Sequence, residues 1–334
     1  MSTKQRVLAI LEANRGKSIS GKAIADRLSW SRAAVWKAVE ELRKEGFQIS
    51  AVTNRGYRLA EDDDLLSVAG IRRYLMPTLS EAGIHVHDIL QSTNITAKRL
   101  ALEGVTHGTV VLAEEQSGGK GRFERRFQSP RSSGLYMSLV LHPAQLALST
   151  PTLITVLAAV SVCEAIESLS DKKPGIKWVN DILLDGKKIC GISCETTMDL
   201  ESRSMPWVVV GIGINVTTKA SSFPEELRQI VGSLYPEGKA EFSRNRLAAE
   251  VINRMASSAA AASSPNYSID LLEKYKKRLV MLNKRITVVL PEGNYQAKAV
   301  DVDESGQLIV QKDDGEICTL LAGEISTRLD VKRG

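Results

Sequence analysis

Cysteine is scarce in this sequence, with only four among 334 residues, at positions 163, 190, 194 and 318. So few thiols in so long a chain do not make the disulfide framework of a small secreted protein, so we expect a reducing, cytoplasmic environment. The chain also lacks an uninterrupted apolar run of about 18 residues, the length that spans a bilayer. The opening stretch MSTKQRVLAILEANRGK has neither the apolar block nor the cleavage site of a signal peptide. We therefore expect neither a membrane partner nor secretion.

Positive charge is in small excess overall, but it is unevenly distributed. The chain has 44 Lys and Arg against 39 Asp and Glu, and residues 1–60 hold 12 of the former against 5 of the latter. The remaining residues hold slightly more acidic than basic side chains. One terminal segment thus carries all the excess positive charge, which is typical of a segment that binds a polyanion.

That basic segment is predicted to form three short helices and a hairpin. Apolar residues recur at helical spacing over 5–13, 21–28 and 31–46, and the runs FQISAV and YRLA then flank the turn Thr53–Gly56. This order is the outline of a winged helix-turn-helix, in which the third helix enters the major groove of DNA. Trp36, within that helix, is expected to pack in the core or against the wing. The acidic residues 61–64 follow as a predicted linker.

The remaining chain falls into two parts by its pattern. Residues 65–282 mix apolar strand-like runs with helical patterns, which favours an α+β fold over a repeating parallel βαβ fold. Helices are expected at 93–104, 152–170, 225–233, 243–262 and 268–281, and Asp185-Gly186 is expected to form a tight hairpin turn. From 283 to 331 short alternating strands are separated by turns, as in a small β-barrel.

A loop rich in glycine and positive charge is the most unusual stretch. It runs from Gln116 to Pro130 directly after a strand-like run, with three glycines and the cations Lys120, Arg122, Arg125 and Arg126. Glycines allow backbone N–H groups to approach an anion closely, so the loop suits a carboxylate or a phosphate. A mobile basic surface loop without a ligand is the alternative interpretation.

Four further motifs accompany this loop in order along the chain. They are S-T-N at 92–94, K-W-x-N-D at 177–181, K-K-x-x-G-I at 187–192 and G-I-G-I-N at 211–215. Together with Q-x-x-G-K-G-R at 116–122 they resemble the biotin protein ligases. With the winged helix in front, the whole chain resembles the bifunctional type that is both ligase and biotin operon repressor. The resemblance implies a multi-domain α+β protein with a winged helix-turn-helix (1–60), a mixed-sheet ligase core (65–282) and an SH3-like β-barrel (283–331).

The resemblance also implies a role for particular residues. The positions expected to bind biotin are Ser92, Thr93, Asn94, Gln116, Lys120, Gly121, Arg122, Lys188 and Gly191, of which Lys188, Arg122 and Lys120 are expected to be catalytic. The positions expected near ATP and Mg²⁺ are Asn180, Asp181, Asn215 and Phe223, and no protein cluster for a tightly bound metal is expected. Lys177 is set aside as a solvated strand end. Two residues depart from the family's loop pattern, Glu124 where a glycine is usual and Phe127 where a tryptophan is usual.

A two-fold function follows as an expectation. The resemblance implies that the chain uses ATP to form biotinyl-5'-adenylate and transfers biotin to a lysine of the carboxyl carrier protein of acetyl-CoA carboxylase. It further implies an operator-binding homodimer promoted by the adenylate. The winged-helix outline places the DNA-binding residues at Ser31, Arg32, Ala33, Lys37, Arg55 and Arg58. A biotin-sensing repressor without catalysis and a lipoate-type ligase remain as alternatives.

Overall fold

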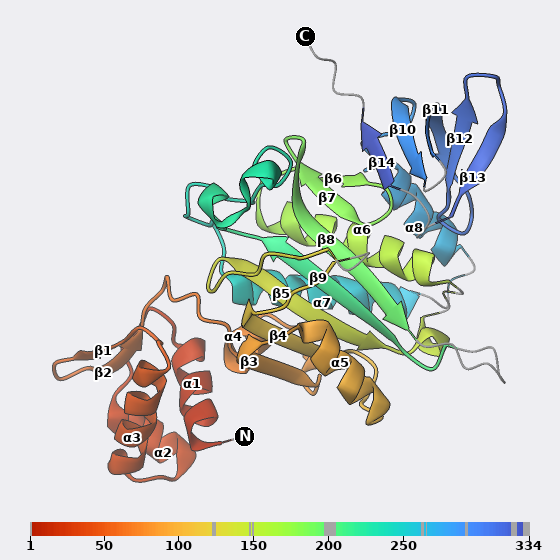
Figure 1. The fold of residues 1–334 in the computed structure, drawn as a ribbon. Coiled ribbons are helices and arrows are strands. Elements are labelled where there is room, and N and C mark those ends of the chain that lie inside the picture. Colours follow the sequence, from red (N-terminus) through yellow and green to blue (C-terminus); the bar gives the residue numbers. More distant parts are fainter. Residues whose placement is uncertain are drawn as a thin grey trace. The chain divides into compact units, whose positions relative to one another are not determined.

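The computed structural model describes most of the chain and divides it into two compact units. The described residues are 2–121, 125–146, 148, 150–196, 205–261, 264, 266–290, 293–321 and 326–329. The first unit comprises residues 1–81 and 242–250, and the second comprises residues 82–241 and 251–334. Figure 1 follows the chain through both units.

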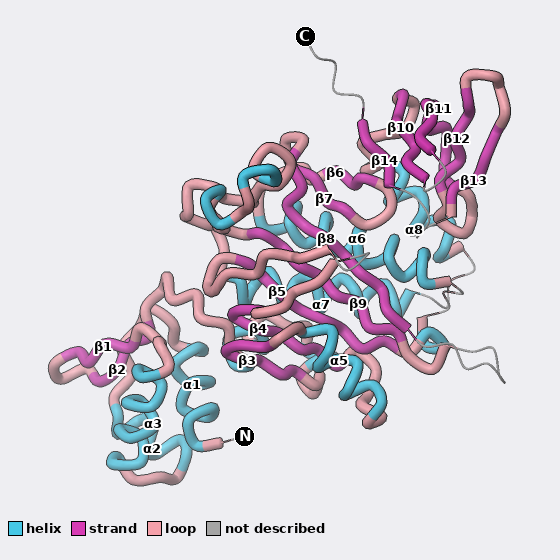
Figure 2. The backbone as a smooth tube through the Cα atoms, in the orientation of Figure 1, coloured by secondary structure: helices cyan, strands magenta, loops and turns pink. Residues whose placement is uncertain are grey.

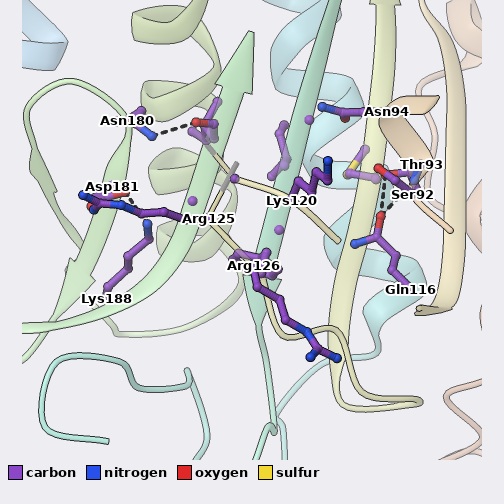
Figure 3. Close-up of a pocket in the computed structure, with 18 of the residues that line it drawn as sticks. Ser92, Thr93, Asn94, Gln116, Lys120, Arg125, Arg126, Asn180, Asp181 and Lys188 are labelled. Atoms are coloured by element: carbon purple, nitrogen blue, oxygen red, sulfur yellow. Dashed lines mark hydrogen bonds and ion pairs between the residues drawn. The ribbon is translucent and has the colours of Figure 1, made fainter. Parts of the chain in front are cut away.

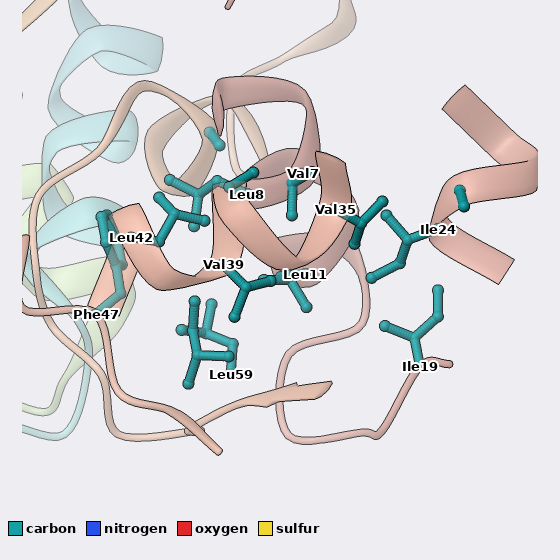
Figure 4. Packing of buried hydrophobic residues seen from close by; sticks show 14 residues of the cluster. Val7, Leu8, Leu11, Ile19, Ile24, Val35, Val39, Leu42, Phe47 and Leu59 are labelled. Carbon is teal, nitrogen blue, oxygen red and sulfur yellow. The ribbon is translucent and has the colours of Figure 1, made fainter. Parts of the chain in front are cut away.

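The first unit begins with the predicted helices and hairpin. Its elements are α1 (Thr3–Ala13), α2 (Gly21–Leu28), α3 (Arg32–Lys44), β1 (Ile49–Val52) and β2 (Gly56–Leu59). Each helix starts at a serine whose side chain accepts a backbone N–H of the first turn, namely Ser2, Ser20 and Ser31. Apolar residues from all three helices and both strands meet in one core, part of which is drawn in Figure 4. The predicted winged helix-turn-helix fold is confirmed.

The hairpin turn depends on a glycine. Gly56 has φ +98°, a left-handed conformation, and a Cβ added there would lie 2.2 Å from the carbonyl oxygen of Ile19. This close approach lets Ile19 and Tyr57 exchange backbone hydrogen bonds of 2.9 and 2.8 Å. The hairpin is thereby fixed to the segment that precedes α2.

The acidic segment after the hairpin lies inside the first unit and is held there through Asp63 and Asp64, so the prediction of a linker at 61–64 is wrong. The Asp63 side chain is buried, and its carboxylate accepts hydrogen bonds from the backbone N–H groups of Gln48 (2.6 Å) and Leu65 (3.1 Å). Burial raises the pKa of this carboxyl. Acidic composition alone suggested solvation, but the backbone donors offered by neighbouring residues outweigh that tendency.

Asp64 joins two segments of the first unit that lie 180 positions apart in the chain. Its carboxylate accepts hydrogen bonds from the backbone N (2.6 Å) and Nε (2.8 Å) of Arg244, and its carbonyl accepts one from Nη2 (2.7 Å). Arg244 is only 1% exposed and begins α7 (Arg244–Ala261). Beside it, Asn245 accepts from Ser67 N and donates to Leu65 O, just before α4 (Val68–Arg72). Residues 242–250 therefore complete the first unit.

The Asp64–Arg244 pair predicts a stability effect. Asp64→Ala leaves the buried guanidinium of Arg244 without its carboxylate. We expect the free energy of unfolding to fall by about 2–3 kcal/mol. This is less than for a fully buried pair, because the Asp64 side chain is 38% exposed. Urea denaturation of the full chain, followed by far-UV circular dichroism, measures the loss. Asp62→Ala, an exposed neighbour, is the matched control and should change little. Equal midpoints for both variants would contradict the prediction.

The second unit is built on a mixed seven-stranded sheet (Figure 2). The strands, in spatial order, are β3 (Ile84–Leu90), β4 (Thr109–Gln116), β5 (Gly134–Leu141), β9 (Val208–Asn215), β8 (Lys187–Thr196), β7 (Asp181–Leu184) and β6 (Gly175–Lys177). Only β3 and β4, joined by α5 (Thr93–Leu102), run parallel. At the β7–β8 turn Asp185 and Gly186 both have positive φ, which confirms the predicted tight hairpin.

Two helices cover opposite faces of this sheet. Helix α5 packs with Val209 in one apolar cluster, whereas Thr155 of α6 (Pro151–Leu169) donates to Cys194, which pairs with Val210 on β9. Because successive strand residues point to opposite faces, α5 and α6 lie on different sides of the sheet. Helix α6 is apolar and long enough to cross a membrane by composition alone, although its hydroxyl residues and Glu164 interrupt the apolar run. Since 72% of its apolar window is buried, packing explains this composition.

The helix predicted at 225–233 is wrong. Only a short 3₁₀ turn, Glu225–Leu227, forms there. The following residues instead pair with the start of β8, where Lys188 N donates to Ile230 O (2.8 Å) and Gly232 N donates to Lys188 O (2.9 Å). Tertiary pairing with a strand therefore overrides the local helical pattern.

The C-terminal part is a five-stranded antiparallel sheet preceded by α8 (Tyr267–Lys276). Its strands, in spatial order, are β13 (Ile317–Leu320), β12 (Leu308–Lys312), β11 (Gly293–Val302), β10 (Arg285–Leu290) and β14 (Ser326–Leu329). Four of these strands, β10 to β13, match the predicted runs, whereas β14 was not predicted, and the short strands with tight turns agree with the expectation of a small all-β domain. Most of the segment 321–326, from the end of β13 to the start of β14, lies outside the described residues.

Candidate functional site

A cavity of about 150 Å³ lies on the seven-stranded sheet beside the start of α5 (Figure 3). Six parts of the chain enclose it: the start of α5, the glycine-rich loop, β5, the β6–β7 connection, β8 and β9. The lining residues are Ser92, Thr93, Asn94, Gln116, Lys120, Gly121, Arg125, Arg126, Phe127, Met137, Lys177, Trp178, Asn180, Asp181, Lys188, Gly191, Ile192, Gly211, Ile212 and Gly213. All five sequence motifs therefore contribute to one site.

Glycines on two neighbouring strands make room for this cavity. Gly191 and Gly213 are direct partners across β8 and β9, and Gly211 lies two residues further along the same face. A Cβ at Gly213 would lie 2.6 Å from the Phe127 ring, and one at Gly211 would lie 2.3 Å from the Asn94 amide. The absence of side chains at these positions therefore lets Phe127 and Asn94 lie directly on the sheet.

One end of the cavity is a network of neutral polar groups. Gln116 Oε1 accepts from the backbone N (2.8 Å) and the hydroxyl (3.2 Å) of Thr93. The Ser138 hydroxyl lies 2.7 Å from Thr93 Oγ1 and 2.6 Å from Asn94 Oδ1. Ser92 precedes α5 without capping it through its side chain, so its hydroxyl is not used by the helix. Such fixed donors and acceptors suit a neutral polar ring system, which they orient.

Cations line the other parts of the cavity, and Figure 3 shows Lys188 on the side opposite Gln116. Lys188 forms an ion pair with Asp181 at 2.5 Å, and Lys120, Arg125, Arg126 and Lys177 also line the wall. The loop is held in shape by backbone hydrogen bonds from Gly121 N to Arg125 O (2.7 Å) and from Phe127 N to Gly119 O (2.8 Å). The described lining as a whole holds five cations against one carboxylate, so the cavity favours an anionic ligand.

Side chains of later elements fix the wall between β6 and β7. Trp178 Nε1 donates to Gly306 O (3.0 Å) in the β11–β12 turn, and the Tyr275 hydroxyl of α8 donates to Val179 O (2.9 Å). Asn180 Nδ2 donates to Ile192 O (2.7 Å). The C-terminal elements thereby position a segment that lines the cavity.

Most candidate residues, but not all, are brought together. Ten of the thirteen expected for biotin, catalysis or nucleotide line the cavity: Ser92, Thr93, Asn94, Gln116, Lys120, Gly121, Asn180, Asp181, Lys188 and Gly191. Arg122 and the unusual Glu124 lie outside the described residues. Asn215 and Phe223 are buried but do not belong to the cavity lining. Asn215 instead donates to Gly232 O (3.0 Å), so a role toward the nucleotide stays a prediction for both residues.

Several lining residues were not among the candidates. Lys177, which the sequence analysis set aside, lines the cavity, as do Trp178, Arg125, Arg126 and Phe127. Lys177 and Trp178 lie inside the K-W-x-N-D motif, and the other three lie in the glycine-rich loop 116–130, so each segment as a whole was a better guide than its individual polar residues. Met137 belongs to no motif, and no sequence signal pointed to it.

The expected DNA-binding residues lie on the surface of the first unit. Arg32, Ala33 and Lys37 are exposed on the first half of α3, and Arg55 and Arg58 are exposed on the hairpin. Ser31 accepts a hydrogen bond from Ala34 N (3.2 Å) and so caps α3. Within the described part of the chain none of these four cations forms an ion pair with an acidic side chain, which leaves them available to phosphates.

Comparison with known proteins accounts for all three parts of the chain. Residues 3–58 match an HTH domain, residues 86–215 match the Biotin/lipoate A/B protein ligase family, and residues 281–328 match the Biotin protein ligase C terminal domain. The chain is 36% identical over 319 residues to the bifunctional ligase/repressor BirA of Bacillus subtilis, covering 94% of this chain and 96% of that one. The chain belongs to the bifunctional biotin ligase/repressor family.

Two further relatives extend the comparison. The bifunctional ligase/repressor BirA of Escherichia coli is 26% identical, covering 97% of this chain and 96% of that one. Among solved structures, the biotin protein ligase from Aquifex aeolicus in complex with biotin and ATP superposes with a TM-score of 0.63 at 26% identity. It covers 74% of this chain and 99% of that chain. The predicted fold class is thereby confirmed for this member of the ligase/repressor family.

The Trp178 hydrogen bond gives a testable consequence for the cavity wall. Trp178→Phe retains an aromatic ring but removes the donor to Gly306 O. The hydrogen bond contributes about 1 kcal/mol, and its loss from the biotin-bound form lowers the affinity for biotin roughly fivefold. We expect calorimetric titration with biotin, the ligand of the Aquifex relative, to show this weakening. Trp207→Phe, a buried tryptophan outside the cavity lining, is the control. Equal biotin affinities in the two variants would exclude a positioning role for Trp178.

Proposed function

We propose that this chain is an ATP-dependent biotin protein ligase that also represses transcription from an operator. The single observation that carries the ligase is the cavity whose lining combines neutral polar side chains with five cations and is formed by all five motifs. The winged helix in the first unit carries the repressor. The fold and the ligase/repressor family both support this pairing.

Biotin fits the two ends of the cavity in one orientation. Its ureido ring is neutral and has both donors and acceptors, which match Ser92, Thr93 and Gln116 together with Asn94. Its carboxylate then points toward Lys188, Lys120 and Gly121, with Arg122 in the same motif. The Phe127 ring, which lies on Gly213 and lines the cavity, offers an apolar surface to the chain that joins them.

The chemistry requires activation of this carboxylate. A carboxylate oxygen attacks the α-phosphorus of ATP, the bond to the bridging oxygen breaks, and pyrophosphate leaves, which gives biotinyl-5'-adenylate. A lysine amine of the carrier protein then attacks the acyl carbon, an amide forms, AMP leaves and the amine loses a proton. Bringing the carboxylate to a phosphate joins two anions, and fixed cations such as Lys188, Lys120 and Arg122 offset their repulsion. No covalent enzyme intermediate is needed.

Mg²⁺ is expected to arrive with the nucleotide. No group of three or more His, Cys, Asp or Glu side chains that could hold a metal occurs among the described residues. Asp181 supplies one carboxylate in the lining and Asn180 an amide, which are oxygen ligands suited to Mg²⁺ completed by phosphates and water. The ion would neutralise phosphate charge, while Asn215 and Phe223 are proposed to contact the nucleotide.

The remaining partners follow from the same assignment. We place the protein in the cytoplasm, where its substrates occur, and propose the carboxyl carrier protein of acetyl-CoA carboxylase as acceptor. We also propose the domain boundaries 1–60, 65–282 and 283–331, and a homodimer as the operator-binding form, because a single winged helix makes few base contacts. Ser31, Arg32, Ala33 and Lys37 would face the major groove, with Arg55 and Arg58 on the wing.

Lys188 provides the test of the ligase. In Lys188→Ala the carboxylate and phosphate lose a charge-assisted contact, and we expect biotin-dependent exchange of labelled pyrophosphate into ATP to slow by at least about tenfold, or 1.4 kcal/mol in the barrier. Lys187→Ala, an exposed lysine one residue earlier that does not line the cavity, should exchange normally. Equal rates in both variants would remove Lys188 from the site. Exchange with lipoate but not biotin would favour a lipoate ligase, and no exchange in the native chain would favour a sensor.

Coupling between the two activities is tested separately. If adenylate binding favours the dimer, the dimer binds adenylate more tightly by linkage, so biotin with ATP should raise both self-association and operator affinity. Analytical ultracentrifugation and an operator titration at fixed salt measure these two effects. Addition of unbiotinylated carrier protein should reverse both because it consumes the adenylate. Operator affinity that ignores biotin and ATP would leave a ligase with a DNA-binding domain but without a switch.

A further inference from the structure

A large aromatic side chain is exposed on the helix expected to enter DNA. Trp36 is 58% exposed on α3, so the expectation that it packs in the core or against the wing is wrong. The helix fills the core through other positions, namely Val35, Ala38, Val39 and Leu42. Trp36 is therefore not needed to complete the packing of this unit.

The surroundings of Trp36 on the helix are positively charged. Arg32, Ala33, Trp36 and Lys37 share one face by their helical spacing, and all four are exposed. The next turn changes sign, with Glu40 and Glu41. Glu40 already pairs with Arg43 at 2.6 Å. Only the first half of the helix thus combines exposed cations with an exposed apolar surface.

We propose that Trp36 contacts the C5-methyl group of a thymine in the major groove of the operator and so contributes to its sequence specificity. This inference rests on the proposed repressor function. The thymine methyl is the apolar group that base edges present in that groove, and it is matched by an apolar side chain. Arg32 and Lys37, on either side of the ring, attract the phosphates and hold the helix in register.

The positive charge of this face of α3 favours DNA over a protein as its binding partner. A second copy of the chain would bring the same cations against each other if the two α3 faces met symmetrically. A nucleic acid duplex instead supplies negative charge around an apolar base edge. The observed combination of two cations with one indole is therefore complementary to DNA.

The experiment uses the full chain and thymine-to-uracil replacement. Duplexes that bind the native protein are first selected from a randomised library in the presence of biotin and ATP. Each thymine of the selected site is then replaced by uracil, which removes only the methyl group. We expect one or two positions at which native affinity falls by about fourfold, the value of one buried carbon.

The variant Trp36→Ala decides whether the ring makes that contact. At those positions the variant should bind thymine and uracil duplexes equally, and its affinity for unrelated DNA and its salt dependence should stay native because no phosphate contact is removed. Leu102→Ala, an exposed apolar residue of α5 in the other unit, should retain the full thymine preference. Native far-UV circular dichroism and a native urea midpoint check that each variant is folded.

Other outcomes would overturn the inference in recognisable ways. A thymine preference that persists in Trp36→Ala would exclude the methyl contact. Weaker self-association without DNA, measured by sedimentation, together with an unchanged thymine preference would assign the ring to a protein interface. Failure of the native chain to select any duplex would contradict the proposed repressor function itself, whereas the first two outcomes leave that function intact.

Discussion

A strip of sheet surface without side chains makes the cavity possible. Gly191 and Gly213 are opposite each other on β8 and β9, and Gly211 extends the strip. The strand register places the three on one face, so that Phe127 and Asn94 can lie against bare backbone. A methyl group at Gly213 would displace the ring, and with it the end of the glycine-rich loop. The position of the glycine-rich loop and its cations thus depends on the lack of side chains at these glycines.

The charged side chains that line this cavity come from elements far apart in the sequence. Lys120 belongs to the loop after β4, Lys177 to β6 and Lys188 to β8, whereas Asp181 is the carboxylate paired with Lys188. These side chains are held by the sheet register and by hydrogen bonds from C-terminal elements, such as Tyr275 to Val179 O. Fixed cations need little reorganisation when charge develops, which is the requirement of adenylate formation.

Local patterns predicted much of the fold, and they failed where distant contacts decide. The three helices and hairpin of the first 60 residues followed from apolar spacing and the turn at Thr53–Gly56, and Asp185-Gly186 followed from turn chemistry. The segment 225–233 read as a helix, but pairing with Lys188 holds it in another conformation.

Motifs predicted the members of the site better than reasoning about single residues did. Lys177 was set aside on its own properties although its motif lines the cavity, and Met137 could be found only from the structure. The environment of Trp36 was also predicted wrongly. A tryptophan is usually packed, but the position of Trp36 on α3 leaves its side chain exposed. In each case the prediction required knowing which residues are close in space. Local patterns in a single sequence do not give these contacts.

The Asp64–Arg244 pair has a consequence for synthesis on the ribosome. Chains emerge from the N-terminus, and domains generally fold as they become available. The helices and hairpin of residues 1–60 are synthesised early, but the partner of Asp64, Arg244, is synthesised 180 residues later. Until Arg244 and Asn245 emerge, the polar groups of residues 64–67 must remain hydrated. The nascent DNA-binding unit therefore gains its last stabilising contacts only after all the cavity motifs, 92 to 215, have been translated.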